Sequence, residues 1–213
     1  MKGFRRLGLA ACVAVAACTS EPSRDAAPAT GSTPLEVRPA TIKSPGGTMS
    51  VVYGGESDPT LLLSAGFLRR SPVGEVRAAS RLSWSPDSER FFVNDSGNAA
   101  WSTFRLWTVD ARAQAEETST IREAAIAELG RRNGCASLPE PDATTRGMGW
   151  SPDGSRVYVL AQVRRQTGGC VWTGVDNVVV AADVETGRLV EVAEGDEARR
   201  RWPTLPWGPV TGP

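Results

Sequence analysis

Two stretches of the chain repeat one pattern: Arg81-Leu-Ser-Trp-Ser-Pro-Asp-Ser-Glu-Arg-Phe-Phe-Val93 and Gly147-Met-Gly-Trp-Ser-Pro-Asp-Gly-Ser-Arg-Val-Tyr-Val159. In each copy a tryptophan ends one segment, Ser-Pro-Asp follows, and an arginine leads into an apolar run. Proline fixes φ at the first corner of a tight turn, and the aspartate can accept hydrogen bonds from the turn backbone. Aromatic and β-branched runs favour strands. Each copy therefore predicts a strand, a tight turn and a second strand.

The shared motif resembles the TolB-type propeller repeat of the bacterial periplasm, whose core is Trp-Ser-Pro-Asp-Gly. The resemblance rests on two firm copies, over about residues 81–110 and 146–192. It implies buried tryptophans at strand ends, structural turn residues, and protein binding as the commonest use of such a domain. The motif residues are Trp84, Ser85, Pro86, Asp87, Trp150, Ser151, Pro152, Asp153 and Gly154.

A weaker third copy runs from Ile42 to Tyr53, where a Ser-Pro pair and glycines precede an apolar run without the tryptophan or the aspartate. A propeller blade takes about 40–45 residues, so residues 35–207, less one insertion, give three to four sheets. We therefore expect a mainly β fold, a short or incomplete propeller-like array of three to four antiparallel sheets with one inserted α-helix. Whether the sheets form a small ring or pack face to face stays open from the sequence.

A helical insertion is predicted at about residues 111–134, because the Ser-Pro pairs begin at 44, 85 and 151 and the second interval is the longer one. The stretch is rich in Ala, Glu, Gln and Arg, which favour helix. Thr120 and Glu123 match a capping box for a helix from about Ile121 to Arg132, and Gly134 can end it. Three apolar residues share one face of this helix: Ile121, Ala125 and Leu129. We interpret the insertion as a connector between blades, with a lid or partner-binding element as the alternative.

Further strands are predicted at Phe104–Asp110 and, as a hairpin, at Asn177–Asp183 and Arg188–Val192. The hairpin pattern Asp-x-x-Thr-Gly-x-Leu is typical of the outer strands of a propeller blade. The Pro-rich stretch Trp202–Trp207 is expected to lie extended against the domain, and residues 208–213 form a C-terminal tail.

Residues 1–17 are predicted to be a signal peptide. Basic residues precede an apolar run of about eleven residues, which is too short to span a membrane because a span needs about twenty. The run ends Val15-Ala-Ala-Cys18, and small residues before a cysteine here resemble the lipobox of bacterial lipoproteins. The resemblance implies cleavage before Cys18 and acylation of that residue. Cys12 also follows small residues and is the alternative, with a shorter apolar run before it.

Residues 18–34 contain no large apolar side chain and predict a flexible tether to the domain at 35–207. Several acyl chains on one cysteine would hold the protein stably on a membrane. The resemblance therefore implies a lipid-anchored protein of the bacterial cell envelope that faces the periplasm. Thr19 follows the anchor, and the absence of aspartate there favours the outer membrane under the enteric sorting rule.

Composition excludes several classes of function. The chain has no histidine, so it holds no Ser-His-Asp or Cys-His site and no histidine zinc ligand. Removal of Lys2, Arg5 and Arg6 leaves 21 of the 24 basic residues against 24 acidic ones, which is no footprint for nucleic acid. The run Arg199–Arg201 is interpreted as a solvated charged face, with a phosphate or lipid A contact as the alternative. We expect no catalytic residues, no metal and no cofactor.

Cys135 and Cys170 remain after the signal peptide and the anchor. Two such cysteines in an envelope protein have one possible intramolecular pairing, so we expect a disulfide between them. A redox-active pair is the alternative, although the spacing is unlike Cys-x-x-Cys.

Function is the property that the residues determine least. We expect a non-catalytic lipoprotein, attached to the membrane through its N-terminal acyl chains, whose β domain binds another envelope protein. The alternative is a carbohydrate or small-ligand binder that uses exposed Trp101 and Trp172, with Trp207 as a further candidate. A hydrolase with a carboxylate pair is the third hypothesis. A cleft lined by Trp101, Trp172 and two close carboxylates would favour the last two hypotheses, and a flat surface the first.

Overall fold

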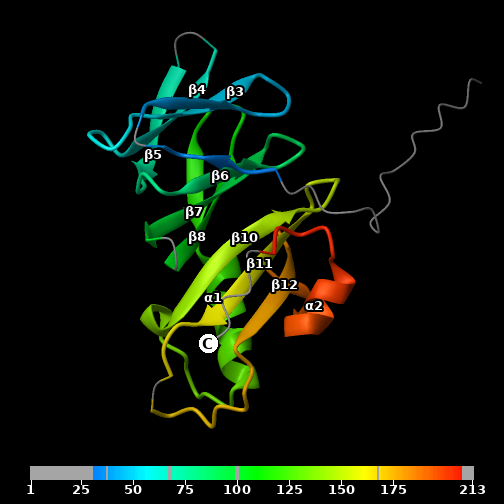
Figure 1. Cartoon of the computed structure of the whole chain (residues 1–213). Helices are drawn as coiled ribbons and strands as arrows, with labels where there is room; N and C mark the ends of the chain where they lie inside the picture. The colour runs from blue at the N-terminus through cyan, green and yellow to red at the C-terminus, as the bar shows by residue number, and fades with distance from the viewer. Residues whose placement is uncertain (1–30, 37, 67–68, 99–100, 167, 208–213) are drawn as a thin grey trace, which may run out of the picture.

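The structure is a computed structural model, and it describes residues 31–36, 38–66, 69–98, 101–166 and 168–207. Three antiparallel sheets follow one another along the chain and lie in a stack, with two α-helices against the third sheet (Figure 1). The predicted signal peptide, Cys12, Cys18, Thr19 and the C-terminal tail lie outside the described residues.

The first sheet is a four-stranded meander of β2 (Ala40–Lys43), β3 (Met49–Tyr53), β4 (Thr60–Ala65) and β5 (Arg69–Glu75). Successive side chains of a strand point to opposite faces. On the face toward the second sheet, four side chains are completely buried: Val51, Tyr53, Leu61 and Leu63. Val52 and Leu62 lie between these positions and are therefore on the outer face, where both stay partly exposed.

The second sheet has five strands in the spatial order β1 (Thr33–Pro34), β6 (Arg81–Trp84), β7 (Arg90–Asn98), β8 (Trp101–Val109) and β9 (Ala115–Thr118). β8 matches the strand predicted at Phe104–Asp110, but it begins three residues earlier and ends one residue earlier. β9 lies within the predicted helical insertion, so that prediction was wrong for residues 115–118. Their composition favours helix, but pairing with β8, from Leu106–Thr118 to Val109–Ala115, makes them the outer strand.

β1 attaches the chain to the second sheet before the predicted end of the tether. The Ser83 hydroxyl donates a hydrogen bond of 2.6 Å to the carbonyl of Gly31, and the Arg81 guanidinium donates to Ser32. Residues 31–34 therefore belong to the domain, which corrects the predicted boundary. This attachment could not be predicted from the residues, because hydrogen bonds and not large apolar side chains hold the segment.

The third sheet is a meander of β10 (Ala143–Trp150), β11 (Arg156–Val163), β12 (Asn177–Asp183) and β13 (Leu189–Glu194). A short 3-10 helix (Glu140–Asp142) precedes β10, and α2 (Gly195–Arg201) follows β13. The β12–β13 pairing confirms the predicted outer hairpin. α2 was not predicted, and it places Arg199–Arg201 in a last helical turn, where positive charge is favourable. Among the described residues, no helix combines the length and the apolar character needed to cross a membrane.

The outer face of the third sheet is covered by the C-terminal part of the chain. Ala198 of α2, Trp202 and Leu205 pack against the β10–β12 strands in one apolar cluster. The rings of Trp202 and Tyr158 lie 5.4 Å apart, and the Trp207 indole donates to the Trp202 carbonyl at 3.0 Å. The expected packing of Trp202–Trp207 on the domain is therefore observed.

The predicted fold class is confirmed: three antiparallel sheets form a mainly β, propeller-like array, and the described strands do not close into a ring. The sheets pack face to face in chain order, like neighbouring blades (Figure 1). Phe91 and Trp107 stack 5.2 Å apart in the core between the first two sheets. Phe92 and Trp150 lie 5.4 Å apart in the core between the second and third sheets.

α1 (Thr120–Arg132) is part of the second core, which corrects its interpretation as a connector only. The predicted apolar face is buried, and Ile126 joins it. The predicted capping box is not formed, because Thr120 is already helical and the N-cap is Ser119, whose side chain makes no capping hydrogen bond. At the other end, Gly134 has φ 62° and the Cys135 N–H donates to the Gly130 carbonyl at 2.9 Å, as in a Schellman motif.

The predicted disulfide between Cys135 and Cys170 is present, with the two Cα atoms 4.1 Å apart. It ties the end of α1 to the loop between β11 and β12. The same loop is held by the Asn133 carbonyl, which accepts hydrogen bonds from the N–H groups of Val171 and Trp172 at 3.0 and 3.1 Å. The helix end and the loop therefore form one connected unit.

Glu128 on α1 should make stability depend on pH. Hydrogen bonds from Arg131, and then from Arg132, lower the pKa of Glu128 to about 2 against its ordinary value of 4.5. A carboxyl group with a lower pKa in the folded protein adds stability above its unfolded pKa, and loses it as pH falls toward the folded value. We expect Glu128→Gln to reduce the free energy of unfolding at neutral pH by about 1 kcal/mol. The effect is this small because Arg131 is solvent-exposed, and solvent weakens an exposed ion pair.

Urea titrations of Glu128→Gln and the unmodified protein over a series of pH values would measure this difference. It should shrink as pH falls from about 4.5 toward about 2. Glu123→Gln on the exposed side of α1 is the matched control. An effect of Glu128→Gln that stays constant over the acidic range would show that the ion pairs are not its cause.

Candidate functional site

Three hairpin turns, which follow β2, β6 and β10, have the same hydrogen bonds. They begin at Ser44, Ser85 and Ser151. In each turn the serine N–H donates to the carbonyl five residues on, and the N–H three residues on donates back to the serine carbonyl, all at 2.8–3.0 Å. Each serine hydroxyl also accepts a hydrogen bond from the N–H five residues on. The weak copy at 42–53 is therefore structurally equivalent to the two firm ones.

The three turns share a left-handed residue and lie side by side. This residue is Gly47, Ser88 or Gly154, with φ of 68°, 67° and 74°. The Ser88 hydroxyl accepts a hydrogen bond of 2.9 Å from the Gly46 N–H of the first turn. On the other side, a Cβ atom at Gly154 would lie 2.7 Å from the carboxylate of Asp87. The turns are thus packed against one another along one end of the stack.

Asp87 and Asp153 complete their own turns. The Asp153 carboxylate accepts hydrogen bonds from the Ser151 hydroxyl and from the N–H and hydroxyl of Ser155. The Ser151 hydroxyl is the main cause that lowers the pKa of Asp153. Asp87 accepts in the same way from Ser85 and from the Glu89 N–H. Both carboxylates therefore have the structural role that the motif predicts.

Trp84 and Trp150 each join their sheet to the preceding one. The Trp84 indole donates to the Ile42 carbonyl at 3.3 Å, and the Trp150 indole donates to the Ser83 hydroxyl at 3.2 Å. Ile42 and Ser83 are equivalent positions, two residues before the turn serine. Both tryptophans are buried, with 8% and 0% exposure. The repeat motif therefore joins neighbouring sheets.

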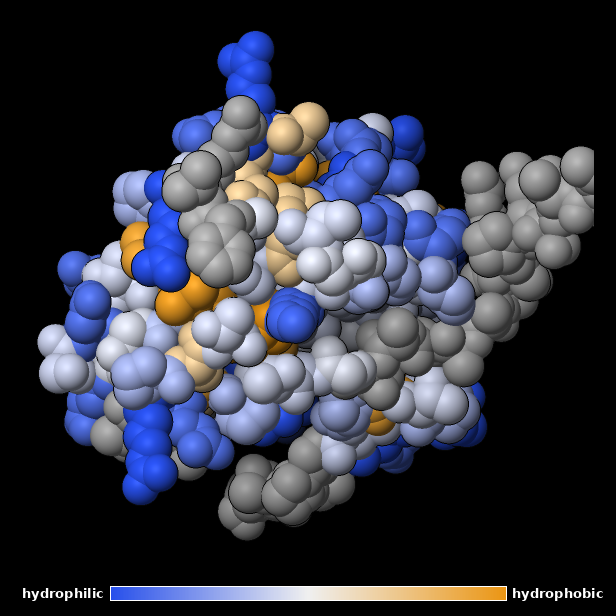
Figure 2. Space-filling model, turned by 90° about the horizontal axis from the view of Figure 1, so that it is seen from above, coloured by the Kyte–Doolittle hydropathy of each residue, from blue (hydrophilic) through white to orange (hydrophobic). Residues whose placement is uncertain are grey.

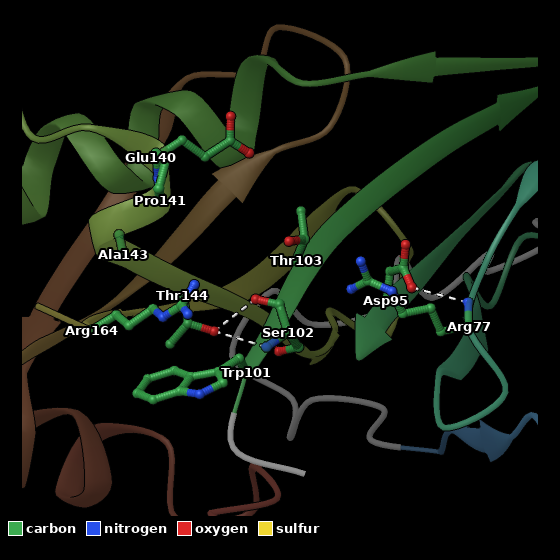
Figure 3. Close-up of a pocket in the computed structure, with 10 residues that line it drawn as sticks. All are labelled: Arg77, Asp95, Trp101, Ser102, Thr103, Glu140, Pro141, Ala143, Thr144 and Arg164. Atoms are coloured by element: carbon green, nitrogen blue, oxygen red, sulfur yellow. Dashed lines mark hydrogen bonds between the residues drawn. The ribbon is translucent and has the colours of Figure 1, made fainter. Parts of the chain in front are cut away.

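A hollow of about 540 Å³ lies between the second and third sheets (Figure 3). Its lining residues on β8 and β10 lie at the strand ends opposite the three turns. Trp101 at the start of β8 forms one wall, and the Arg164 guanidinium lies 4.9 Å from the centre of its ring. Ser102 and Thr144 line the hollow where β8 crosses β10: the Ser102 N–H donates to the Thr144 hydroxyl at 2.9 Å. The other lining residues are Arg77, Asp95, Thr103, Glu140, Pro141 and Ala143.

Some charged side chains of the hollow are ion-paired and others are not. Asp95 accepts hydrogen bonds from the Arg77 N–H and the Ser80 hydroxyl, and its other oxygen lies 3.6 Å from Arg105. The pKa of Arg105 is raised, mainly by its hydrogen bond to Glu117. Glu140 lies 2.9 Å from Arg122. Glu140 is thus paired with Arg122, and Asp95 shares Arg105 with Glu117, whereas the guanidinium groups of Arg77 and Arg164 have no carboxylate within ion-pair distance among the described residues.

The two tryptophans predicted as ligand contacts lie apart. Trp101 lines the hollow and is partly exposed, but Trp172 packs against the core that contains α1. Among the described residues, the two tryptophans therefore do not line one common cleft, the arrangement that would favour a ligand-binding or hydrolytic role. The charged residues of the hollow were not predicted, because Arg77 and Arg164 lie in two separate connections, Asp95 lies on β7, and the three share no sequence motif.

The outer face of the first sheet is the second candidate surface. Cross-strand pairing aligns Thr41, Val52, Leu62 and Pro72 in one row, and Lys43, Ser50, Ser64 and Arg70 in the next. Figure 2 looks down on this end of the molecule and shows apolar residues gathered near its middle, with hydrophilic residues around them. This face is a shallow apolar band beside a positively charged row.

Comparisons with known proteins assign no family. No family model and no curated protein matches the chain. Hydrazine synthase from Kuenenia stuttgartiensis is similar in structure with a TM-score of 0.36 and 19% identity, over 74% of this chain and 37% of that chain. A Bacteroides fragilis protein provisionally described as a 6-phosphogluconolactonase has a TM-score of 0.37 and 14% identity, over 74% of this chain and 39% of that one. The chain spans less than two fifths of both structures, and similarities of this size assign neither a fold nor a function.

Proposed function

We propose that the protein is a non-catalytic, lipid-anchored binding protein of the bacterial cell envelope. Acyl chains on Cys18 hold it to a membrane, most simply the outer membrane, on the periplasmic side. The outer face of the first sheet binds a partner protein. The TolB-type motif supports this use, and the absence of histidine together with the ion-paired carboxylates of the hollow supports a binding role over hydrolysis.

The proposed partner surface rests on a difference between the two end faces of the stack of sheets. The stack has two end faces, and the C-terminal segment covers the outer face of the third sheet with Trp202 and Leu205. The outer face of the first sheet has no such cover among the described residues, although Val52 and Leu62 form an apolar row on it. Burial of apolar surface favours association. The partner should therefore present apolar side chains beside acidic ones, which would meet Lys43 and Arg70.

The anchor and this face act together. Cys18 precedes Gly31 by 13 residues, a length that reaches at most about 45 Å when fully extended. Gly31 is fixed on the second sheet by its bond to Ser83. The domain is thus restricted to a zone near the membrane surface, where a bound partner is held at a high local concentration.

Site-specific photo-crosslinking in intact cells tests the partner surface. A photoreactive phenylalanine analogue at Leu62 should give one adduct of defined mass, which mass spectrometry identifies. Val190 on β13 is the matched control, because it is an aliphatic strand residue with 47% exposure at another surface. Val52→Asp in the Leu62 variant should abolish the adduct. No adduct at Leu62, or the same adduct at Val190, would refute docking on the first sheet.

Cys18→Ser should abolish incorporation of radiolabelled palmitate and block lipoprotein processing. The physical reason is that the thiol of Cys18 is the acylated group in the proposed lipobox. Cys12→Ser is the control and should leave both labelling and processing intact. Palmitate that still enters the Cys18→Ser protein would place the anchor at Cys12 instead.

A further inference from the structure

We infer that the hollow between the second and third sheets binds a sugar acid, a sugar ring that carries a carboxylate. This site is separate from the partner face, because none of its lining residues lies on the outer face of the first sheet. Three properties of the hollow lead to this class of ligand: its net charge, its aromatic wall and its mixture of hydrogen-bonding groups.

The charged residues of the hollow favour a negatively charged ligand. Asp95 and Glu140 are ion-paired with Arg105 and Arg122, and Arg105 also pairs with Glu117. With Arg77 and Arg164 the group has four guanidinium groups against three carboxylates, one net positive charge, and Figure 3 shows the side chains of Arg77 and Arg164 extending toward the middle of the hollow from opposite sides. Guanidinium groups bind carboxylates through short, charge-assisted hydrogen bonds.

The aromatic wall of the hollow favours a ligand that contains a ring. Trp101 is partly exposed and lines the hollow, and Arg164 lies over its indole. Tryptophan combines a broad apolar face with a rigid position, which suits stacking against the flat C–H face of a sugar. Because Arg164 covers one face of this indole, a ligand between Trp101 and Arg77 would contact the part of the ring that stays exposed, with its carboxylate near a guanidinium.

The hydrogen-bonding groups of the hollow favour a ligand that carries hydroxyl groups over a purely hydrocarbon one. Carboxylate oxygens of Asp95 and Glu140 accept hydrogen bonds, the guanidinium groups donate them, and the Thr103 hydroxyl does both. Sugar hydroxyls also donate and accept, so they satisfy both kinds of partner. The volume of about 540 Å³ lies within the range of small-ligand sites. A free sugar acid and the terminal residue of an envelope polysaccharide present this same chemistry.

The test uses the indole N–H signals of the ¹⁵N-labelled mature lipoprotein in detergent micelles. Glucuronate, its methyl glycoside, glucose and cyclohexanecarboxylate are titrated separately. The Trp101 signal, identified by its loss in Trp101→Phe, should shift saturably with glucuronate. Arg77→Gln and Arg164→Gln should each weaken binding about tenfold or more. Arg188→Gln, at an exposed arginine of the β12–β13 turn, is the control and should bind as the unmodified protein does.

The possible results distinguish the two sources of the ligand and show whether the proposal holds. Equal binding of the methyl glycoside supports a polysaccharide end as the source, and selective binding of glucuronate supports a free sugar acid. No saturable shift of the Trp101 signal with glucuronate, or unchanged binding by both arginine variants, would overturn the site. Glucose or cyclohexanecarboxylate binding as tightly as glucuronate would overturn the assigned ligand class. Crosslinking at Leu62 is read out independently, so the two proposals fail separately.

Discussion

Replacing Trp150 with alanine should lower the free energy of unfolding by about 3–5 kcal/mol, as is typical for truncation of a buried tryptophan. Trp150 is completely buried, packs on Phe92 and donates its indole hydrogen bond to Ser83 on the neighbouring sheet. The variant therefore loses packing and a contact between sheets at once. A domain of this size has a total stability of about 5–15 kcal/mol, so the melting temperature should fall steeply.

Two further variants place this result in context. Trp84→Ala should have a comparable effect, because Trp84 occupies the equivalent position and reaches Ile42 in the same way. Asp153→Ala should cost less, about 1.5–3 kcal/mol for hydrogen bonds to a charged group. Thermal and urea melts measure all three. An unchanged melting temperature for Trp150→Ala would show that the motif is not a core element of the fold.

Loss of the disulfide should have the second large effect. Cys135 and Cys170 close a loop of about 36 residues, and the chain-entropy relation gives about 4 kcal/mol for a crosslink of that size. We expect the double variant Cys135→Ser/Cys170→Ser to lose stability of this order in urea titrations. Most of the loss should arise in the unfolded state, so the native contacts around Asn133 should persist.

Thiol chemistry gives the control for this prediction. The mature protein purified without reductant should show no free thiol at either cysteine, and added reductant should destabilise it as much as the double variant. The reductant should then have no effect on the double variant itself. Rapid labelling of Cys135 or Cys170 in the native, unreduced protein would contradict the disulfide.

Local turn chemistry explains why much of the fold could be predicted. The Ser-Pro-Asp turns need little beyond their own residues, since Ser151 and Asp153 make the bonds that close the hairpin. The third turn at Ser44 is recognisable for the same reason, although its tryptophan is missing. The order of the strands then follows from hairpins that link consecutive strands, except that β1 pairs with β6.

The features that could not be predicted from the sequence depend on contacts between distant parts of the chain. β9 has a helix-favouring composition, and it becomes a strand because β8 offers an unpaired edge. α2 has seven residues and a single buried side chain, Ala198, so it shows almost no helical periodicity. Similarly, the exposure of Trp101 and the partial burial of Trp172 depend on which strands pass over them, and that information is not local.

The equivalence of the sheets rests on the indole hydrogen bonds of Trp84 and Trp150 to the preceding sheet. Hydrogen exchange of the tryptophan indole N–H groups, followed by NMR, tests it most directly. Both indole protons should exchange slowly, at rates close to those of the most protected amides of β7 and β11, whereas the partly exposed Trp101 should exchange rapidly. Exchange of the Trp84 or Trp150 indole as fast as that of Trp101 would contradict the account.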